Sequence, residues 1–408
     1  MDDLHGNLRG IIEHMDDIQN LGIDVLYMTP IFQSNSCHKY DTTDYYQIDP
    51  SFGTTEDLKE LVQKAHERGM KVVLDAVYNH TGREFFAFAD ILENGEKSKY
   101  RDWYFIDGFP LKSEWGEIPN FKCFGYYGGM PKLNLKNPEV EKYITDVACY
   151  WIKECDIDGW RLDVGDEISH FFWKNFRKAV KAVKKDMLII GEIWHYAGDF
   201  LEGDEWDTVM NYPFYLNLID LLADEKITVS QFVQNLGYLK GRLNKNCYPL
   251  MWNLIDSHDT ARFLHLCNDN KKKQHLAAAF QLLLPGMPMI YYGDEYAMPG
   301  ANDPDCRRGM YWDEEYQDKE MYEWYKRLIQ VRKSHACIVE GELAGIVTED
   351  EEGTIVLIRK NGEETIAMIF NCSSRAKKFN EYTQKYNLLT ENTFDGNVEG
   401  FDAAVIVL

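Results

Sequence analysis

Four short segments of the chain end in side chains of the kind that cleave bonds. They are DAVYNH at 75–80, GWRLDV at 159–164, GEIW at 191–194 and NLIDSHD at 253–259. In three of them an apolar run ends at or near a carboxylate, namely Asp163, Glu192 and Asp259. A carboxylic acid and a carboxylate held beside a glycosidic bond can cleave it. The residue types therefore predict glycoside cleavage.

Other polar side chains of these segments fit the same chemistry. Arg161 precedes Asp163 by two residues, so on a strand both side chains point to the same face. A guanidinium there keeps a carboxylate ionised at neutral pH, although it could also be a plain ion-pair partner. Asp75 sits deeper in its segment, and we expect it to brace Arg161 rather than contact substrate. His80 and His258 can donate hydrogen bonds to hydroxyl groups, and neither lies in a metal-binding pattern.

The elements that position these residues alternate along the chain. Apolar runs of strand length are found at 24–29, 71–77, 160–164, 188–193, 208–210, 250–255 and 289–291. Helical spacing separates the early ones, at 8–21, 57–68, 143–154 and 171–184. This alternation predicts parallel strands with helical crossovers, and a barrel of such strands gathers side chains at their carboxyl ends. The predicted fold class is α/β, a (β/α)8 TIM-type barrel.

Two regions depart from this rhythm. Residues from about 78 to 135 are rich in Gly and aromatic residues and predict a lobe inserted after the third barrel strand. Residues 336–408 change to a period of two, with Asn361-Gly362 as a hairpin turn, and predict a C-terminal antiparallel β-sandwich domain. The barrel domain is then 1–335. Only seven strands precede the C-terminal domain, one fewer than a closed barrel of eight needs, so either a strand is missing or another segment fills the gap.

Composition excludes several classes of partner. The net charge of -23 disfavours nucleic acid and anionic membranes, whereas a neutral sugar polymer is not repelled. The acidic N-terminus has no signal-peptide pattern, and Pro and Gly break the most apolar stretch, at 277–292, so it is not a membrane span. The nine cysteines form no CxxC pair and their number is odd. They predict reduced thiols in a cytoplasmic protein.

In this order, the four segments resemble the signature segments of the alpha-amylase superfamily of retaining glycoside hydrolases. The resemblance runs from about residue 4 to the C-terminus. It implies that the missing strand is the first barrel strand. It also implies that Asp163 is the nucleophile, Glu192 the acid/base, and Asp259 a third acid that stabilises the distorted sugar. In a retaining enzyme the carboxyl groups of the first two lie about 5–5.5 Å apart.

The same resemblance assigns residues that bind the sugar. In HKYDTTDYY, Tyr40 matches a tyrosine that stacks on the sugar, and Asp41 is expected to pair with Arg307 or Arg308 across the non-reducing side of the pocket. The alternative is that Tyr40 is an ordinary aromatic residue of a loop, without a role in binding.

Two further segments resemble the neopullulanase, cyclomaltodextrinase and maltogenic amylase branch. They are MPKLN at 130–134 and GEIWH, in which Trp194 would contact the acceptor-side sugar. Glu167 is also expected on the acceptor side, although Gly165-Asp166 before it departs from the branch's common form.

The resemblance implies an alpha-glucan hydrolase. Its substrates would be maltodextrins, cyclodextrins or pullulan, cut at alpha-1,4 bonds and also at alpha-1,6 bonds. The alternatives are a 4-alpha-glucanotransferase using the same residues, or a truncated inactive member. No cofactor is predicted. Many superfamily members bind calcium, but Asn79 is one candidate ligand without a complete set, so no metal is predicted. The branch usually carries an N-terminal domain that helps it to dimerise, and this chain is expected to lack that domain, so the oligomeric state stays open.

Overall fold

The computed structural model describes residues 6–112, 118–244 and 246–408. Its chain divides into two compact units. The first unit is Met1–Ile193 with Asp199–Val209, and the second is Trp194–Gly198 with Met210–Leu408. This division differs from the predicted one at residue 335, which stays a prediction. Residues 1–5, and residues 113–117 of the predicted lobe, lie outside the described residues.

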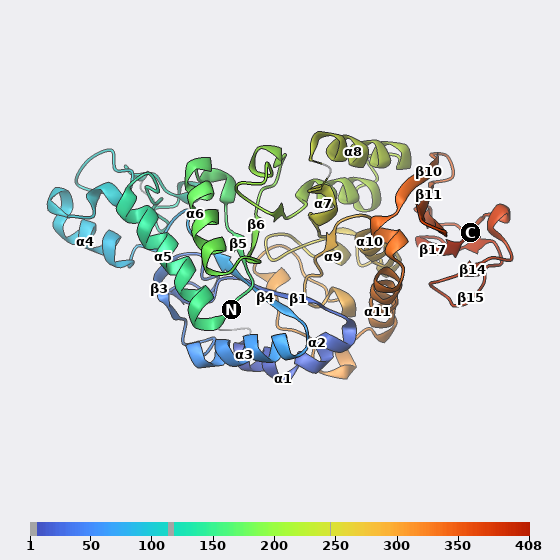
Figure 1. Ribbon diagram of the computed structural model, residues 1–408, viewed down its shortest axis with the longest axis horizontal. Helices are drawn as coiled ribbons and strands as arrows, with labels where there is room; N and C mark the ends of the chain where they lie inside the picture. The colour runs from blue at the N-terminus through green and yellow to red at the C-terminus, as the bar shows by residue number, and fades with distance from the viewer. Residues whose placement is uncertain (1–5, 113–117, 245) are drawn as a thin grey trace. The chain divides into compact units, whose positions relative to one another are not determined.

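A five-stranded parallel sheet forms the centre of the first unit (Figure 1). Its strands, in spatial order, are β1 (Val25–Met28), β4 (Lys71–Ala76), β5 (Gly159–Leu162), β6 (Leu188–Gly191) and β7 (Thr208–Val209). The central strands β4 and β5 are buried almost throughout, as their continuous apolar runs predict for a sheet covered on both faces. The predicted parallel strands of this region are confirmed.

Helices connect these strands. They are α1 (Leu8–Glu13), α2 (Met15–Leu21), α3 (Thr55–Glu67), α5 (Pro138–Cys155) and α6 (His170–Val183). Each of α3, α5 and α6 begins at a side chain that accepts a hydrogen bond from the first turn: Thr54, Asn137 and Ser169. The helical structure predicted over 8–21 is confirmed, but His14 interrupts it and divides it into α1 and α2. Gly22 ends α2 with a φ of 101°, which glycine adopts without strain.

The predicted lobe has little regular structure. It holds α4 (Phe86–Asn94) and the 3-10 turns η2 (Gly95–Lys97), η3 (Arg101–Trp103) and η4 (Phe124–Tyr126). Isolated antiparallel bridges, such as His80 with Lys132, join its ends. Before the lobe, β2 (Phe32–Ser34) and β3 (Thr42–Ile48) form a hairpin that was not predicted from the sequence. The η5 turn (Gly165–Glu167) and η6 (Gly198–Phe200) follow β5 and β6.

The second unit continues the alternation of helices and strands. Its helices are α7 (Tyr212–Leu218), which runs on as the π-helical segment η7 (Ile219–Ala223), α8 (Val229–Arg242), α9 (Phe263–Leu266), α10 (Lys271–Leu283) and α11 (Lys319–Ser334). Strands β8 (Trp252–Asn253) and β9 (Met287–Pro288) pair in parallel. Both are shorter than predicted, and β9 lies just before the expected range 289–291. Short turns are η8 (Tyr248–Leu250), η9 (Asp294–Tyr296), η10 (Asp305–Arg307) and η11 (Glu314–Tyr316).

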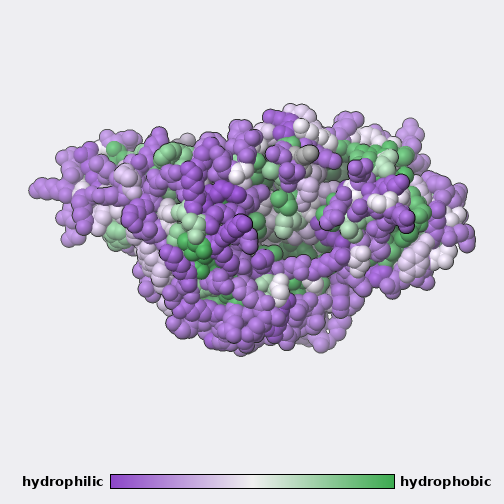
Figure 2. Space-filling view, viewed as in Figure 1, coloured by the Kyte–Doolittle hydropathy of each residue, from purple (hydrophilic) through white to green (hydrophobic). Residues whose placement is uncertain are grey.

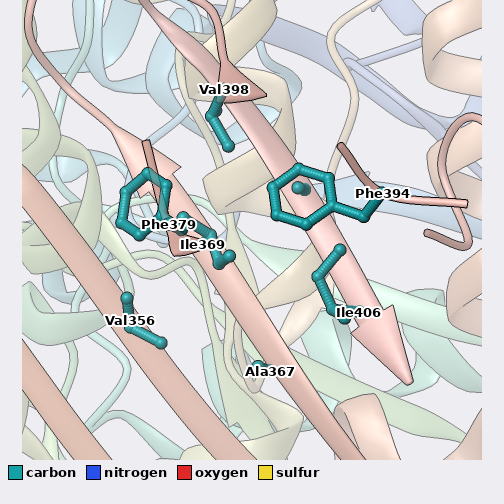
Figure 3. Packing of buried hydrophobic residues seen from close by; sticks show 8 residues of the cluster. Val356, Ala367, Ile369, Phe379, Phe394, Val398 and Ile406 are labelled. Atoms are coloured by element: carbon teal, nitrogen blue, oxygen red, sulfur yellow. The ribbon is translucent and has the colours of Figure 1, made fainter. Parts of the chain in front are cut away.

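A six-stranded antiparallel sheet closes the chain, which confirms the predicted C-terminal antiparallel fold. Its order is β10 (Glu342–Glu349), β11 (Thr354–Asn361), β12 (Glu364–Asn371), β17 (Asp402–Val407), β14 (Tyr386–Asn387) and β15 (Asn392–Thr393). β13 (Lys377–Lys378) pairs with β16 (Asn397–Val398), and α12 (Ala336–Glu340) and η12 (Asn380–Tyr382) complete the region. Figure 3 shows Ile369, Ile406 and Phe394 in the apolar cluster that packs this sheet.

The surface is mostly hydrophilic. Hydrophilic residues cover most of the face seen in Figure 2, with smaller hydrophobic areas between them. Within the described ranges, none of the helices combines the length and the apolar character needed to cross a bilayer.

Candidate active site

Arg161 lies at the centre of a buried group of carboxylates in the first unit. Asp75 on β4 and Arg161 on β5 are direct partners in the sheet register. The Arg161 Nη1 donates to Asp75 Oδ2 at 2.9 Å and to Asp163 Oδ1 at 3.0 Å. Its Nη2 lies 2.7 Å from Glu192 Oε2. One guanidinium therefore contacts three of the predicted site residues, which we call the Arg161 cluster.

The cluster brings the two predicted catalytic carboxylates close together. Because Asp163 and Glu192 contact the two ends of one planar guanidinium, their contacting oxygens lie within roughly 8 Å of each other. Burial lowers the pKa of Arg161, but the neighbouring Asp75 and Glu192 carboxylates outweigh it and hold that pKa well above its usual value. The guanidinium therefore stays charged.

Asp75 is almost fully buried and forms an ion pair with Arg161, the contact that the predicted bracing role requires. Burial raises the pKa of Asp75 to about 6, against the lowering effect of Arg161 and of the Tyr27 hydroxyl. Tyr27 donates to Asp75 Oδ2 at 2.7 Å, and Tyr40 donates to the same oxygen at 3.2 Å. Sequence reasoning missed Tyr27, whose only signal was its place in a predicted strand.

The backbone after Asp163 adopts an uncommon conformation that orients Glu192. Val164 has φ 47° and ψ 42°, a left-handed conformation that is strained for a β-branched residue. In this conformation its N–H donates to Glu192 Oε2 at 3.0 Å. Glu192 follows Gly191, where a Cβ would meet the ring of Trp206 at 2.2 Å. The GEIW segment therefore needs glycine at position 191, because the Trp206 indole packs directly against it.

His80 is buried, and both of its ring nitrogens have protein partners. Its Nε2 donates to the Tyr40 carbonyl at 2.9 Å, and its Nδ1 lies 3.4 Å from the Asn79 amide nitrogen. Burial lowers the pKa of His80 to about 4, so the ring is neutral at pH 7. The ring of Phe124 stacks on it. These contacts hold the Tyr40 loop, and donation from His80 to a sugar stays a prediction.

Lys132 of the MPKLN segment binds three oxygens with one ammonium group. Its Nζ lies 2.5 Å from Asn79 Oδ1, 2.7 Å from Glu167 Oε2 and 3.1 Å from the Glu167 carbonyl. The candidate calcium ligand Asn79 therefore already faces a cation, so these residues do not fit an added metal ion. Glu167, predicted to face the acceptor sugar, is here an ion-pair partner of Lys132, and its acceptor-side role stays a prediction.

Replacing Lys132 by methionine should destabilise the protein by about 1–2 kcal/mol, because three oxygens lose a charged donor. Chemical unfolding of the variant and of Lys136→Met, an exposed lysine four residues on, measures the difference. Addition of calcium or a chelator should leave the unfolding midpoint of the wild type unchanged. A calcium-dependent midpoint, or equal stability of the two variants, would contradict this interpretation.

Asp41 lies in the loop between β2 and β3. Its carboxylate accepts hydrogen bonds from the hydroxyls of Ser34 and Ser36. The loop is anchored by the buried ion pair of Lys39 with Asp49, whose atoms lie 2.9 Å apart. The predicted pairing of Asp41 with Arg307 or Arg308 stays a prediction.

In the second unit, Asp259 lies between a histidine and an arginine. His258 Nε2 is 3.1 Å from Asp259 Oδ2, and Arg307 Nη2 is 3.5 Å from Asp259 Oδ1. The Arg307 Nε also donates to the His258 carbonyl and contacts Asp303, each at 2.9 Å. Arg308 instead pairs with Asp305. The structure thus brings together three of the predicted site residues of this unit.

Trp194 presents an indole face beside the same segment. It is 41% exposed and stacks on Tyr212, with ring centroids 3.8 Å apart and planes 14° from parallel. The Tyr212 hydroxyl lies 3.3 Å from the Ser257 hydroxyl, next to His258 in the chain. An exposed, rigidly backed indole of this kind can carry a flat apolar ligand face.

A second set of buried carboxyl groups includes Asp256 of the NLIDSHD segment. Asp256 accepts from the Phe263 N–H at 2.7 Å, and Arg262 donates to Asp294 at 3.2 Å. Burial raises the pKa of Asp256 and of Asp294 above their usual values. The adjacent Glu295 is also buried, and burial raises its pKa to about 7. Sequence reasoning missed this group, because its members come from separate segments.

Replacing Glu295 by glutamine should stabilise the protein at pH 8 by on the order of 2–3 kcal/mol. Burial raises the folded-state pKa of Glu295 to about 7 from its ordinary value of 4.5, so folding opposes ionisation. The wild type loses stability as pH rises through this window, while the amide stays neutral and still accepts from the Gly293 N–H. Urea unfolding at pH 5 and pH 8 measures the effect, with Glu315→Gln as the exposed control. A gain of the same size at both pH values would contradict the assignment.

A metal centre is not evident from clustering. In residues 6–112, 118–244 and 246–408, no group of three or more His, Cys, Asp and Glu side chains could hold a metal ion. Seven of the predicted site residues form two local groups, with Asp75, Asp163 and Glu192 around Arg161, and His258 and Arg307 around Asp259.

Known proteins resemble this chain along most of its length. The family described as "Alpha amylase, catalytic domain" matches residues 1–319. A cyclomaltodextrinase of Geobacillus thermopakistaniensis is 48% identical over 371 residues, which cover 91% of this chain and 63% of the relative. Neopullulanase 2 of Thermoactinomyces vulgaris is 43% identical over 367 residues, covering 90% of this chain and 62% of the relative.

A solved structure shows the same arrangement of the chain. A cyclomaltodextrinase superposes with a TM-score of 0.94 and 39% sequence identity, covering 98% of this chain and 71% of that one. The chain spans less than two thirds of the length of the two relatives named above.

Proposed function

The chain belongs to the alpha-amylase family, and we propose on this premise that it hydrolyses alpha-glucosidic bonds with retention of configuration. Its fold is that family's (β/α) barrel with a C-terminal antiparallel β domain. The observation that carries the proposal is the Arg161 cluster, in which one buried guanidinium contacts Asp75, Asp163 and Glu192.

We assign Asp163 as the nucleophile. Its carboxylate attacks the anomeric carbon while Glu192 gives a proton to the departing glycosidic oxygen, so a glycosyl ester forms and the bond to the leaving sugar breaks. Glu192 then takes a proton from water, the water oxygen attacks the anomeric carbon, and the ester bond to Asp163 breaks. The contact of Asp163 with Arg161 favours its ionised form.

Two contacts hold the proposed acid/base Glu192 in place. The Arg161 contact and the Val164 N–H bond are both made to Oε2. Asp259, flanked by His258 and Arg307, is proposed as the third acid, which binds sugar hydroxyls in the distorted state.

We propose maltodextrins, cyclodextrins and pullulan as substrates, cut mainly at alpha-1,4 bonds. Two similar proteins carry the names cyclomaltodextrinase and neopullulanase, which supports this range. The remaining predicted residues would contact the sugars: Tyr40, Asp41, His80, Glu167, Trp194, His258 and Arg307. The substrate is uncharged, which agrees with the strongly acidic chain.

We place the protein in the cytoplasm. All nine cysteines lie in the described part of the chain, and each is a thiol rather than half of a disulfide. Such usage is typical of a reducing compartment. Cell fractionation with an antibody against the protein would test the placement.

The proposed activity is tested by incubating the protein with β-cyclodextrin, maltohexaose and pullulan. We expect maltose or short maltodextrins as products, and proton NMR of the first products should show the alpha anomer. Products of the beta anomer would contradict the retaining mechanism. No cleavage of any of the three would overturn the proposal, and products longer than the substrate would identify a glucanotransferase.

A further inference from the structure

The Tyr27 hydroxyl reaches the Arg161 cluster from the neighbouring strand β1. Tyr27 is paired with Val73 of β4 in the sheet register, and Asp75 lies two residues beyond Val73, on the same face of that strand. Asp75 is in turn the register partner of Arg161. The phenol spans the step of two residues, so its hydroxyl donates to Asp75 Oδ2 at 2.7 Å. Three adjacent strands therefore contribute one side chain each to a hydrogen-bonded row.

One guanidinium is shared among three carboxylates in this cluster, so each further donor to a carboxylate matters. Asp75 Oδ2 accepts from Tyr27 at 2.7 Å, from Arg161 at 2.9 Å and from Tyr40 at 3.2 Å. Asp75 Oδ1 accepts from Arg161 at 3.2 Å. The Tyr27 bond is the shortest of these four contacts. A hydroxyl that donates to a carboxylate favours the ionised form of that carboxylate.

Asp75 titrates close to neutral pH because opposing effects act on it. Burial raises the pKa of Asp75 to about 6, while the Arg161 charge and the Tyr27 hydrogen bond lower it. Burial also raises the pKa of Tyr27 well above its usual range, so the Tyr27 hydroxyl keeps its proton and remains a donor. The titratable and charged groups that face Asp75 are Tyr27 of β1, Tyr40 of the loop between β2 and β3, Tyr78 just after β4, Arg161 of β5 and Glu192 just after β6, and Asp163 is linked to it through Arg161.

We propose that Tyr27 is a positioning residue of the Arg161 cluster, whose hydroxyl holds Asp75 in the ionised form that fixes the guanidinium between Asp163 and Glu192. The inference rests on the proposed function, in which those two carboxylates carry the reaction. Tyr27 acts through Asp75 and Arg161 rather than on the sugar. A protonated carboxyl accepts more weakly from a guanidinium than a carboxylate does, so loss of the Asp75 charge would loosen the contact that fixes Arg161.

The first test is the pH profile of Tyr27→Phe, a substitution that removes only the hydroxyl. We expect the acidic limb of kcat/KM for maltohexaose to move to higher pH by about one unit, because Asp75 then ionises at a higher pH. The variant should lose about tenfold at pH 5.5 and stay within about twofold of wild type at pH 8. Tyr104→Phe is the matched control, since it removes the hydroxyl of another buried tyrosine, one that bonds Thr81, and its profile should coincide with that of wild type.

Two outcomes of this test would overturn the inference. One is an acidic limb that stays where it is in wild type. The other is a loss of the same size at every pH, which would show that the Tyr27 hydroxyl only stabilises the fold. Far-ultraviolet circular dichroism confirms that each variant is folded.

The second test is thermal unfolding, which needs no turnover. Since folding raises the pKa of Asp75 from its ordinary value of 3.8 to about 6, the protein loses stability as pH rises through this window. In Tyr27→Phe this pKa should be higher still, so the loss continues above pH 6. The deficit in thermal midpoint relative to wild type should therefore be larger at pH 7.5 than at pH 5. In an Asp75→Asn background, the same substitution should have an equal effect at both pH values.

The two tests separate this inference from the proposed function. A wild type that cleaves no glucan, together with the expected pH dependence of unfolding, would overturn the proposed function and support the control of Asp75 by Tyr27. A deficit in thermal midpoint that is equal at pH 5 and pH 7.5 while Asp75 is present would overturn the inference, whether or not the wild type is active.

Discussion

Asp163→Asn should lower the turnover of maltodextrins by at least about 10⁴-fold while the protein stays folded. An amide nitrogen or oxygen cannot form the glycosyl ester that the proposed mechanism requires. The asparagine has nearly the shape of the aspartate and can still accept from Arg161 through its oxygen, so the sheet should not change. Initial rates on maltohexaose and β-cyclodextrin measure the loss.

The control is Asp186→Asn, the same chemical change at an exposed aspartate just before β6. It should leave the rates unchanged. Rates of the Asp163 variant within tenfold of wild type would remove Asp163 from the role of nucleophile. Independently, a slowly hydrolysed fluorinated maltosyl fluoride should label the wild type on Asp163, as mass spectrometry of the digested protein would show.

Arg161→Met should abolish activity and destabilise the protein by about 3–5 kcal/mol. Its side chain is fully buried, and its removal leaves Asp75, Asp163 and Glu192 without their shared positive charge. A buried carboxylate without a partner costs far more than a broken surface pair. The matched control is Arg68→Met, which removes a pair with the exposed Asp16 and should cost about 1 kcal/mol or less.

The pH dependence identifies the cause of this loss. Burial raises the pKa of Asp75 to about 6 although Arg161 lowers it, so the pKa should rise further in the variant. A carboxyl whose folded-state pKa is raised weakens the fold as pH rises from about 4 towards that pKa. The difference in thermal midpoint between variant and wild type should thus be larger at pH 7.5 than at pH 5. A difference independent of pH would indicate lost packing instead.

The sequence predicted the parts of the site that local spacing controls. Arg161 and Asp163 are two residues apart on one strand, and their shared face follows from the period of a strand. The contact of Asp75 with Arg161 was expected, but its geometry depends on the register between β4 and β5, which the DAVYNH segment alone does not determine. The left-handed conformation of Val164 carries no sequence signal, because valine rarely adopts it.

Contacts between distant segments were harder to predict. Lys132 reaches Asn79 and Glu167 across 53 and 35 residues, so the MPKLN pattern pointed to a subfamily rather than to an ammonium site. Strand lengths were also harder to predict, since β9 has only two residues, Met287 and Pro288, and lies before the predicted range.

The Arg161 cluster also has a consequence for inhibitor choice. Three acidic groups surround one guanidinium, so the local charge is negative at neutral pH even after pairing. Such a field attracts a ligand that carries a positive charge where the anomeric carbon would lie. Protonated iminosugars should therefore bind more tightly than neutral sugars of the same shape, and more tightly as the medium becomes less salty. Uronic acids and sulfated glucans, which bring negative charge to the same place, should be excluded.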